Sequence, residues 1–372
     1  MTQADAPFTA IRPASTDEAL AATDNVCAAA MARAGDEVRD IYLRFAGEPV
    51  HMRVAGPVLA DYMALTFEHL QDTSAAHETP ALRIDMWDRA HTGLGCPGVP
   101  CIPDATICLD AGLITHYLDQ HVIRYERGHC TMVLDRVNQR IYSCRNDGND
   151  LALYERSKPF PIMLATWYQD QGIQQLHAGL VSKNGRGVLF IGASGSGKST
   201  ATLACALDGF DYLGDDHNGL RLDEDGVCWG YSYYNAARIG DGHLRHFPEL
   251  APHEVPPHCQ WDEKSLVYMS QVIPERMVAQ TRIDAVVLPR IVGGPETRIR
   301  KASRLECLLA LAPSTLKIPL SPGIDGLMNL TDFIPRIACY RLELGDDVRQ
   351  IPGCVEDILN EAPAPEEENC SL

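Results

Sequence analysis

The sequence predicts two domains, an α+β domain in the N-terminal half and an α/β domain in the C-terminal half. Residues 41–54 and 121–144 alternate apolar and polar side chains as half-buried strands do, whereas residues 58–70 have the apolar spacing of a helix. In the second half, an apolar strand at 188–191 runs into a glycine-rich turn and then a helix. The polar, turn-rich stretch 145–150 marks the expected boundary between the domains.

The composition supports two ordinary globular domains. The chain has 372 residues, of which 45% are apolar and 22% charged, and this supplies enough apolar side chains for two cores. We therefore expect an N-terminal domain at 1–150, a second domain at 151–360, and a disordered acidic tail at 361–372, where proline and glutamate dominate.

The N-terminal half carries no chemical motif, and substrate docking is its expected role. Proline and glycine residues fill a loop at 92–103. The expected elements are, in order, a loose arm and short helix within the first 35 residues, a hairpin at 41–45 and 50–54, a helix at 58–70, a strand at 82–86 and a meander at 121–125, 130–134 and 140–144.

The C-terminal half is expected to begin with a helix at 162–168. Strands at 176–181 and 187–191 follow, joined by a turn at Asn184 and Gly185. A helix at 200–207 ends at Gly209, and a strand at 210–213 leads into two acidic residues.

The turn after the strand at 188–191 has the pattern Gly-x-x-x-x-Gly-Lys-Ser of a phosphate-binding (Walker A) loop. In such loops the glycines let successive backbone N–H groups point into one hollow at the positive end of the following helix. The lysine contacts the β- and γ-phosphates, and the serine hydroxyl ligates Mg²⁺. The expected nucleotide contacts are Gly192, Ala193, Ser194, Gly195, Ser196, Gly197, Lys198, Ser199 and Thr200.

Asp215 and Asp216 are candidates for work on the transferred phosphate. Ligands of open α/β sheets bind at the carboxyl ends of the strands, so both carboxylates lie near the loop if the strand at 210–213 neighbours the strand of the loop. One could then accept a proton and the other aid the metal. The competing interpretation is a solvated turn, because Asp-Asp-His-Asn is also good turn chemistry. His177, at the start of a strand, could likewise be either structural or catalytic when it is considered alone.

Charge and cysteine content exclude several classes of function. The formal net charge of −18 disfavours a general attraction to nucleic acid or an anionic membrane surface. The N-terminus lacks the basic region followed by an apolar run that a signal peptide has, and no apolar stretch reaches membrane-spanning length. We therefore expect a cytoplasmic protein.

The 13 cysteines are scattered through the sequence, and we expect them to be reduced, partly buried side chains. Zinc at Cys96, Cys101 and Cys108 beside His91 is a minor alternative, since the spacing is irregular.

His177, the loop and the aspartate pair together resemble the catalytic core of the HPr kinase/phosphorylase family. The matching pieces are Leu-His-Ala-Gly at 176–179, Gly-Ala-Ser-Gly-Ser-Gly-Lys-Ser at 192–199, and Gly-Asp-Asp at 214–216. The resemblance implies an HPr-kinase-like C-terminal domain using ATP and Mg²⁺. It also implies that Asp215 is the base for a serine hydroxyl with His177 managing its proton, that Lys198 holds phosphate, and that Ser199 and Asp216 hold the metal.

The rest of the chain resembles the divergent branch found beside genes for ribosomal peptides, such as the lasso-peptide kinases. The segments that carry this softer similarity are Trp-Asp at 87–88, Asp-Glu-Lys at 262–264, Ile-Asp-Ala-Val-Val-Leu-Pro at 283–289 and Leu-Ala-Pro-Ser-Thr at 311–315. That branch implies phosphorylation of a peptide's terminal serine, a peptide or small-protein partner, and a possible homo-oligomer. The Glu-x-Arg-Gly element of the regulatory enzymes is absent, which leaves the second metal ligand open and disfavours HPr as the acceptor. Arg238 and Lys264 are candidates for neutralising phosphate charge.

Three functions remain open from the sequence. The chain could be a peptide-tailoring serine kinase, an HPr-type regulatory kinase/phosphorylase, or a nucleotide-dependent switch or ATPase that transfers nothing.

Overall fold

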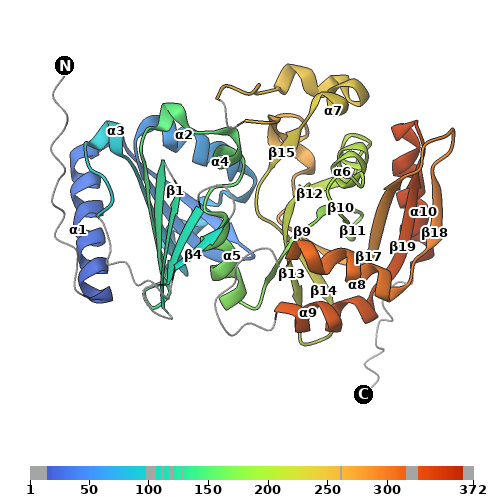
Figure 1. Ribbon diagram of the computed structural model, residues 1–372, viewed down its shortest axis with the longest axis horizontal. Helices are drawn as coiled ribbons and strands as arrows, with labels where there is room; N and C mark the ends of the chain where they lie inside the picture. Colours follow the sequence, from blue (N-terminus) through green and yellow to red (C-terminus); the bar gives the residue numbers. More distant parts are fainter. Residues whose placement is uncertain are drawn as a thin grey trace. The chain divides into compact units, whose positions relative to one another are not determined.

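A computed structural model shows the mixed α/β fold that the sequence predicts (Figure 1). The residues that it describes are 15–97, 106–109, 113–117, 121–127, 129–259, 262–315 and 326–362. Within them, no helix has the length and apolar character needed to cross a membrane. The chain divides into unit 1, comprising Met1–Ala64 and Gln71–Leu151, and unit 2, comprising Leu65–Leu70 and Ala152–Leu372.

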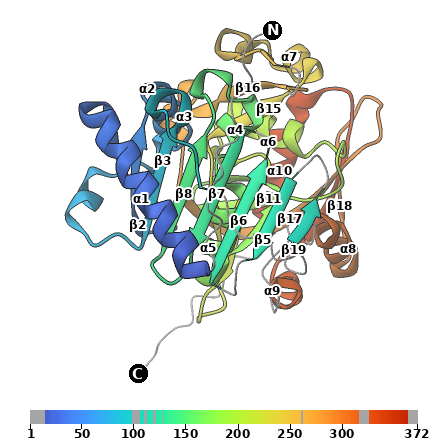
Figure 2. The same ribbon diagram turned by 60° about the vertical axis from the view of Figure 1, so that its left-hand side comes forward.

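Unit 1 is built on one eight-stranded sheet in the order β1-β2-β3-β8-β7-β6-β5-β4. Strands β2, β3 and β8 run parallel to one another, and the other pairs are antiparallel. Figure 2 shows α1 lying across a face of this sheet. The elements are α1 Thr16–Ala34, β1 Val38–Phe45, β2 Glu48–Ala55, α2 Pro57–Thr66, β3 Leu82–Asp88, α3 Arg89–Thr92, β4 Thr106–Leu109, β5 Leu113–Tyr117, β6 Val122–Arg127, β7 Cys130–Asp135 and β8 Arg140–Arg145.

Two features of unit 1 differ from the sequence expectation. Helix α1 has 19 residues, whereas we expected a short helix in this region. Ser15 caps it, and the residues on its buried face are mostly small. Alanines carry little apolar contrast, so the periodic signal is weak although alanine is the best helix former. Strands β4 and β5 were not expected either, since their segments follow a proline-rich loop.

Unit 2 contains a nine-stranded mixed sheet with helices on both faces (Figure 1). Its central path is β12-β10-β11-β17-β14-β13-β9, β19 pairs with β17, and β18 pairs with β19. The sheet strands are β9 Gln174–His177, β10 Gly179–Lys183, β11 Arg186–Phe190, β12 Asp211–Gly214, β13 His217–Leu222, β14 Cys228–Ser232, β17 Gln280–Ile291, β18 Arg298–Lys301 and β19 Ala338–Leu344.

A separate two-stranded ribbon and seven helices complete the described part of unit 2. They are β15 Ala236–Ile239 and β16 Ser265–Tyr268, with α4 Leu153–Ser157, α5 Pro161–Asp170, α6 Lys198–Leu207, α7 Asp241–His246, α8 Arg304–Thr315, α9 Gly326–Phe333 and α10 Ile351–Glu361.

Alternation along the strands builds two cores, one on each face of the sheet. In β11 and just after it, Val188 and Phe190 join the core that includes α6 and α10, whereas Leu189 and Ile191 join the core beside α8 and α9. A strand buried on both faces reads as a continuous apolar run, which is what this segment shows. Unit 2 is therefore a three-layer arrangement with the sheet in the middle.

Strand directions bring three chemically interesting segments to one edge of this sheet. Strands β11 and β12 are both antiparallel to β10, so their carboxyl ends lie at the same edge, where β10 begins. The strand at 210–213 is not the direct neighbour of the strand of the loop, the condition under which we expected both carboxylates near the loop, because β10 lies between them. The single strand expected at 176–181 is also two strands, β9 and β10, which separate at Ala178 to pair with different neighbours.

Candidate functional site

The loop between β11 and α6 has the backbone that a phosphate-binding loop requires. Gly192, Gly195 and Gly197 have φ values of 141°, 78° and 104°, a region that favours glycine. A Cβ on Gly197 would also lie 2.4 Å from Leu344 Cδ1. The loop then delivers the chain into the first turn of α6, where the free N–H groups and the helix dipole favour an anion.

Lys198 lies within this loop. Its ammonium donates hydrogen bonds to the carbonyl oxygens of Gly192 at 2.8 Å and Ala193 at 3.1 Å. The side chain is only 6% exposed, and burial lowers its pKa while the Asp215 carboxylate opposes that shift. The lysine is therefore a desolvated cation already directed into the loop.

Asp215 follows β12 and is buried beside the loop. Burial raises the pKa of its carboxyl, while nearby Lys158 and Lys264 and hydrogen bonds from the Ser199 hydroxyl and the Arg238 backbone oppose the rise. Magnesium prefers oxygen ligands of this kind, and the hydroxyl and the carboxylate already face each other. The pair Ser199 and Asp215 fits a magnesium ion.

Asp216 makes a different set of contacts. His177 Nε2 lies 2.5 Å from one carboxylate oxygen, and the Lys158 ammonium forms an ion pair with the other. The imidazole is 38% exposed and the carboxylate 24%, so both can be reached from the cavity. Asp216 is thus coupled to histidine, whereas Asp215 is coupled to the loop serine.

The backbone around these carboxylates is fixed by hydrogen bonds at the point where the strands separate. The Ala178 N–H donates to Asp216 O at 2.9 Å, and the Asn218 amide donates to Ala178 O at 2.7 Å and Gly214 O at 3.3 Å. These contacts hold the end of β12 against the start of β10. They place His177 opposite His217 in the pairing of β9 with β13.

His217 and His243 are both neutral neighbours of the loop. Burial, helped by the charges of Lys158 and His177, lowers the pKa of His217 well below its ordinary value. Burial also lowers the pKa of His243. The Gly240 N–H donates to His243 Nδ1, so Nε2 carries the proton and faces the Thr200 hydroxyl at 3.4 Å.

These residues surround one cavity of about 460 Å³. The lining combines the glycine-rich loop, histidines and carboxylates, and the two basic residues Arg238 and Lys264. The lining residues are His177, Ser194, Gly195, Gly197, Lys198, Ser199, Thr200, Asp215, Asp216, His217, Arg238, His243, Lys264 and Ile291.

The structure brings most of the sequence candidates together and adds three side chains that were not candidates from the sequence, namely Lys158, His217 and His243. Gly192, Ala193 and Ser196 belong to the loop, although they do not line the cavity. Lys158 was missed because its only signal is a single lysine before Pro159. Lys158 lies two residues before Phe160, whose φ of 56° is unusual for a bulky residue.

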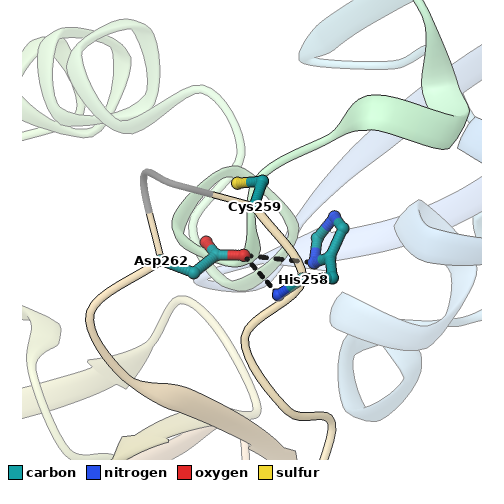
Figure 3. Close-up of side chains that lie close together, drawn as sticks. All are labelled: His258, Cys259 and Asp262. Carbon is teal, nitrogen blue, oxygen red and sulfur yellow. Dashed lines mark hydrogen bonds and ion pairs between the residues drawn. The ribbon is translucent and has the colours of Figure 1, made fainter.

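A second cluster, His258, Cys259 and Asp262, has ligand atoms within 4.8 Å of one another (Figure 3). The Arg156 guanidinium lies 3.0 Å from His258 Nε2, which must accept, so Nδ1 carries the proton and donates to Asp262 at 3.1 Å. Asp262 also accepts from the Leu153 N–H at 2.7 Å. With both ring nitrogens engaged, this network fastens a loop to α4 and offers no imidazole lone pair to a metal.

The zinc alternative at Cys96, Cys101 and Cys108 lies largely outside the described residues. Cys101 is not described, and of Cys108 only its place in β4 is given. Cys96 itself contacts the Arg124 guanidinium at 3.5 Å, and His91 pairs with Glu37 at 3.1 Å.

Among the comparisons with known proteins, only the one with solved structures finds similarity. No protein-family model and no curated protein matches it. One solved structure, the Hpr(Ser) kinase/phosphatase from Coxiella burnetii, is similar over 50% of this chain and 94% of its own, with 13% identity and a TM-score of 0.26. Values this low carry no argument for a shared fold or activity, so the functional assignment rests on the geometry of the cavity.

Proposed function

We propose that this chain is a serine kinase that transfers the γ-phosphoryl group of ATP, with Mg²⁺, to the hydroxyl of a peptide or small protein. The observation that supports this most is the presence, in one cavity, of a phosphate-binding loop and a carboxylate paired with histidine. A loop for binding alone has no need of the second feature. Positioning and charge neutralisation carry most of the catalysis in such transfers.

The two carboxylates have different roles in this proposal. Asp215, buried against Ser199, serves with that hydroxyl as the magnesium site, and Asp216 is the base. This reverses the roles that the family resemblance implies. The reason is that Asp216 is more accessible and is backed by His177, whereas Asp215 is enclosed between the loop serine and the Arg238 backbone.

The serine oxygen forms a bond to the γ-phosphorus while the bond from that phosphorus to the β,γ-bridging oxygen breaks. The serine proton passes to Asp216, with His177 able to relay it to solvent, and ADP leaves. Mg²⁺, when bound, neutralises charge on the phosphate oxygens, and Lys198 does the same from the loop.

Lys158 holds Asp216 in place for this role. It is 16% exposed and forms an ion pair with Asp216. Burial lowers its pKa to about 8, although the nearby Asp215 carboxylate opposes that shift. While protonated, Lys158 fixes the orientation of the Asp216 carboxylate, and it loses its charge at alkaline pH. We assign it as a positioning residue rather than as a group that touches substrate.

The acceptor that we propose is a peptide serine, and the lasso-type peptide with a terminal serine is the first candidate because of the sequence resemblance.

The proposed function is tested by measuring whether the rate of ADP release depends on the acceptor. The assay compares a peptide ending in serine, the same peptide ending in alanine, and HPr, each with ATP and Mg²⁺. Lys198→Ala is the inactive control, and Lys301→Gln, on the exposed strand β18, is the matched control.

A serine kinase releases ADP faster only in the presence of an acceptor serine, and Lys301→Gln behaves as the wild type. Stimulation by HPr instead of the peptide would indicate a regulatory kinase. The same rate of ADP release with the serine peptide, the alanine peptide and no peptide would contradict the proposal and indicate an ATPase.

A further inference from the structure

Ile291 is an aliphatic side chain that lines the cavity and is open to solvent. It is the last residue of β17 and is 63% exposed. Among the described residues that line the cavity it is the single aliphatic one, and the others are glycines or carry polar or charged side chains. Binding cavities combine a few polar groups with apolar side chains that cover the apolar parts of a ligand. Ile291 is thus the place in this cavity where an apolar part of a ligand can be covered.

The backbone holds Ile291 at a fixed position beside the phosphate loop. Ile291 is paired with Leu344 of β19, and the next N–H, that of Val292, donates to Leu344 O at 3.1 Å. A Cβ on Gly197 of the loop would lie 3.6 Å from Ile291 Cγ1, which is van der Waals contact. A side chain carried by a paired strand presents a preformed surface, and this reduces the ordering cost of binding.

The order of the strands places Ile291 and the two aspartates on opposite sides of the loop. Asp215 and Asp216 follow β12, which lies beyond β10 on one side of β11, whereas β17 lies on the other side of β11. Strands β11 and β17 are parallel, so Ile291, at the carboxyl end of β17, lies at the same edge of the sheet as the loop. A ligand that extends along the loop from the aspartates therefore meets Ile291 with its far end.

We propose that Ile291 binds the nucleoside of a purine nucleoside triphosphate, with its side chain packed against the face of the base. This inference rests on the proposed function for the position of the γ-phosphate beside the aspartates. The nucleoside, at the other end of the triphosphate, then leaves the loop on the side of β17. Apolar packing is not directional, and an aliphatic side chain forms no hydrogen bond with the edge of a base. The contact therefore does not discriminate adenine from guanine.

Val292 provides a matched control for this contact. It is 51% exposed and directly follows Ile291, but it is not among the described residues that line the cavity. Successive side chains along a strand point to opposite faces. Because both side chains are exposed, serine at either position should leave the fold intact. A nucleoside contact predicts an effect on binding at Ile291 and none at Val292.

Isothermal titration calorimetry with ATP, GTP and inorganic tripolyphosphate, each with Mg²⁺, tests the contact, because tripolyphosphate has the phosphates without a nucleoside. We expect Ile291→Ser to bind ATP and GTP each about tenfold more weakly than the wild type, the ratio that ~1.4 kcal/mol produces. Its affinity for tripolyphosphate should change less than about threefold, the scale of a surface substitution that removes no contact. Ile291→Leu, which keeps an aliphatic side chain, and Val292→Ser should stay within the same limit for all three ligands.

An equal loss of ATP and tripolyphosphate affinity in Ile291→Ser would overturn the nucleoside contact, because Ile291 would then only shape the loop. Unchanged ATP affinity in Ile291→Ser, or an equal loss in Val292→Ser, would also overturn it. Failure of the kinase proposal is separate. ATP binding that depends on Ile291 without phosphoryl transfer to any acceptor keeps the contact and removes the kinase, whereas transfer with ATP binding that does not depend on Ile291 does the reverse.

Discussion

At the scale of single residues, two adjacent carboxylates have different partners, and the roles that we propose for them follow from this difference. Asp215 is buried against the Ser199 hydroxyl, whereas Asp216 meets an imidazole and a lysine. The sequence predicted that both would be near the loop, because Gly-Asp-Asp follows a strand. It could not predict their partners, since Lys158, which pairs with Asp216, comes from a segment far away along the chain.

Asp215→Asn and Asp216→Asn separate these roles. We expect Asp216→Asn to lower turnover by about 10²- to 10⁴-fold, the usual contribution of a general base, while MgATP affinity is retained. Asp215→Asn should instead weaken the magnesium dependence of nucleotide binding. Single-turnover transfer and nucleotide titrations with and without Mg²⁺ measure both effects. Full turnover by Asp216→Asn would show that it is not the base.

Asp215→Asn also has a predicted effect on stability. Burial raises the folded-state pKa of Asp215 above its unfolded value, so the ionised form costs folding free energy at neutral pH, and this cost disappears as pH falls through the raised pKa. The neutral amide should therefore unfold at the same temperature or higher at pH 7. A lower melting temperature at pH 7 would mean that the ionised carboxylate stabilises the fold.

The titration of Lys158 should set the alkaline limb of the pH profile of activity. Because burial lowers its pKa to about 8, the ion pair with Asp216 should be lost as pH rises through that value, and kcat/KM should fall. Lys158→Arg keeps its charge and should move this fall to about pH 10 or above, the range that an arginine tolerates. Lys158→Met should lower kcat at pH 7 with little change in KM for ATP. An unchanged alkaline limb in Lys158→Arg would assign it to another group.

At the scale of elements, the site exists because three segments reach the same edge of one sheet. The strand, loop and helix at 188–207 were predictable, since apolar periodicity and a phosphate-loop pattern specify them locally. The order β12-β10-β11 was not, because pairing depends on contacts between distant segments. The division of 174–183 into β9 and β10 was missed for the same reason, as Ala178 and Gly179 read as a continuous strand.

Gly179 permits the close packing of α6 on β10, and this gives a test at the same scale. A Cβ at Gly179 would lie 2.0 Å from the Thr202 hydroxyl, which donates to Lys198 O at 2.9 Å. Gly179→Ala should therefore cost about 1–3 kcal/mol of unfolding free energy, as overpacking does. Thr202→Ala in the same chain should recover part of it. Chemical denaturation of the wild type, the two single variants and the double variant measures these changes in unfolding free energy.

Gly353→Ala is the control for this cycle. Gly353 is exposed in α10 with nothing within 4 Å of an added Cβ, so alanine should stabilise the helix by about 0.5–1 kcal/mol. If Gly179→Ala changed the unfolding free energy as little as Gly353→Ala does, this would contradict the tight packing of α6 against β10.

At the scale of the whole molecule, the chain contains two compact units, and each has a hydrophobic core of its own. The change in pattern near residue 150 led us to expect a boundary there, and the division of the chain lies between Leu151 and Ala152. The sequence could not predict that Leu65–Leu70 belongs with unit 2, because that segment continues a helix of unit 1. All residues that line the cavity belong to unit 2.

MgATP should therefore stabilise unit 2 selectively. A ligand at 100 times its Kd adds about 2.7 kcal/mol to the unit that binds it. In a unit of this size that corresponds to a shift of roughly 5–10 °C. Differential scanning calorimetry should show one transition that moves with MgATP and one that does not, and Lys198→Ala should abolish the movement. An equal shift of all unfolding signals would show that the units unfold as one.

The central claim is transfer of a phosphoryl group to a serine at this cavity, and intact-mass spectrometry of the acceptor tests it most directly. A peptide ending in serine is incubated with the protein, ATP and Mg²⁺, beside the same peptide ending in alanine and beside the Lys198→Ala protein. We predict a gain of about 80 Da, one HPO₃ group, on the serine peptide alone. Consumption of ATP with no mass gain on the serine peptide or on HPr would contradict the claim.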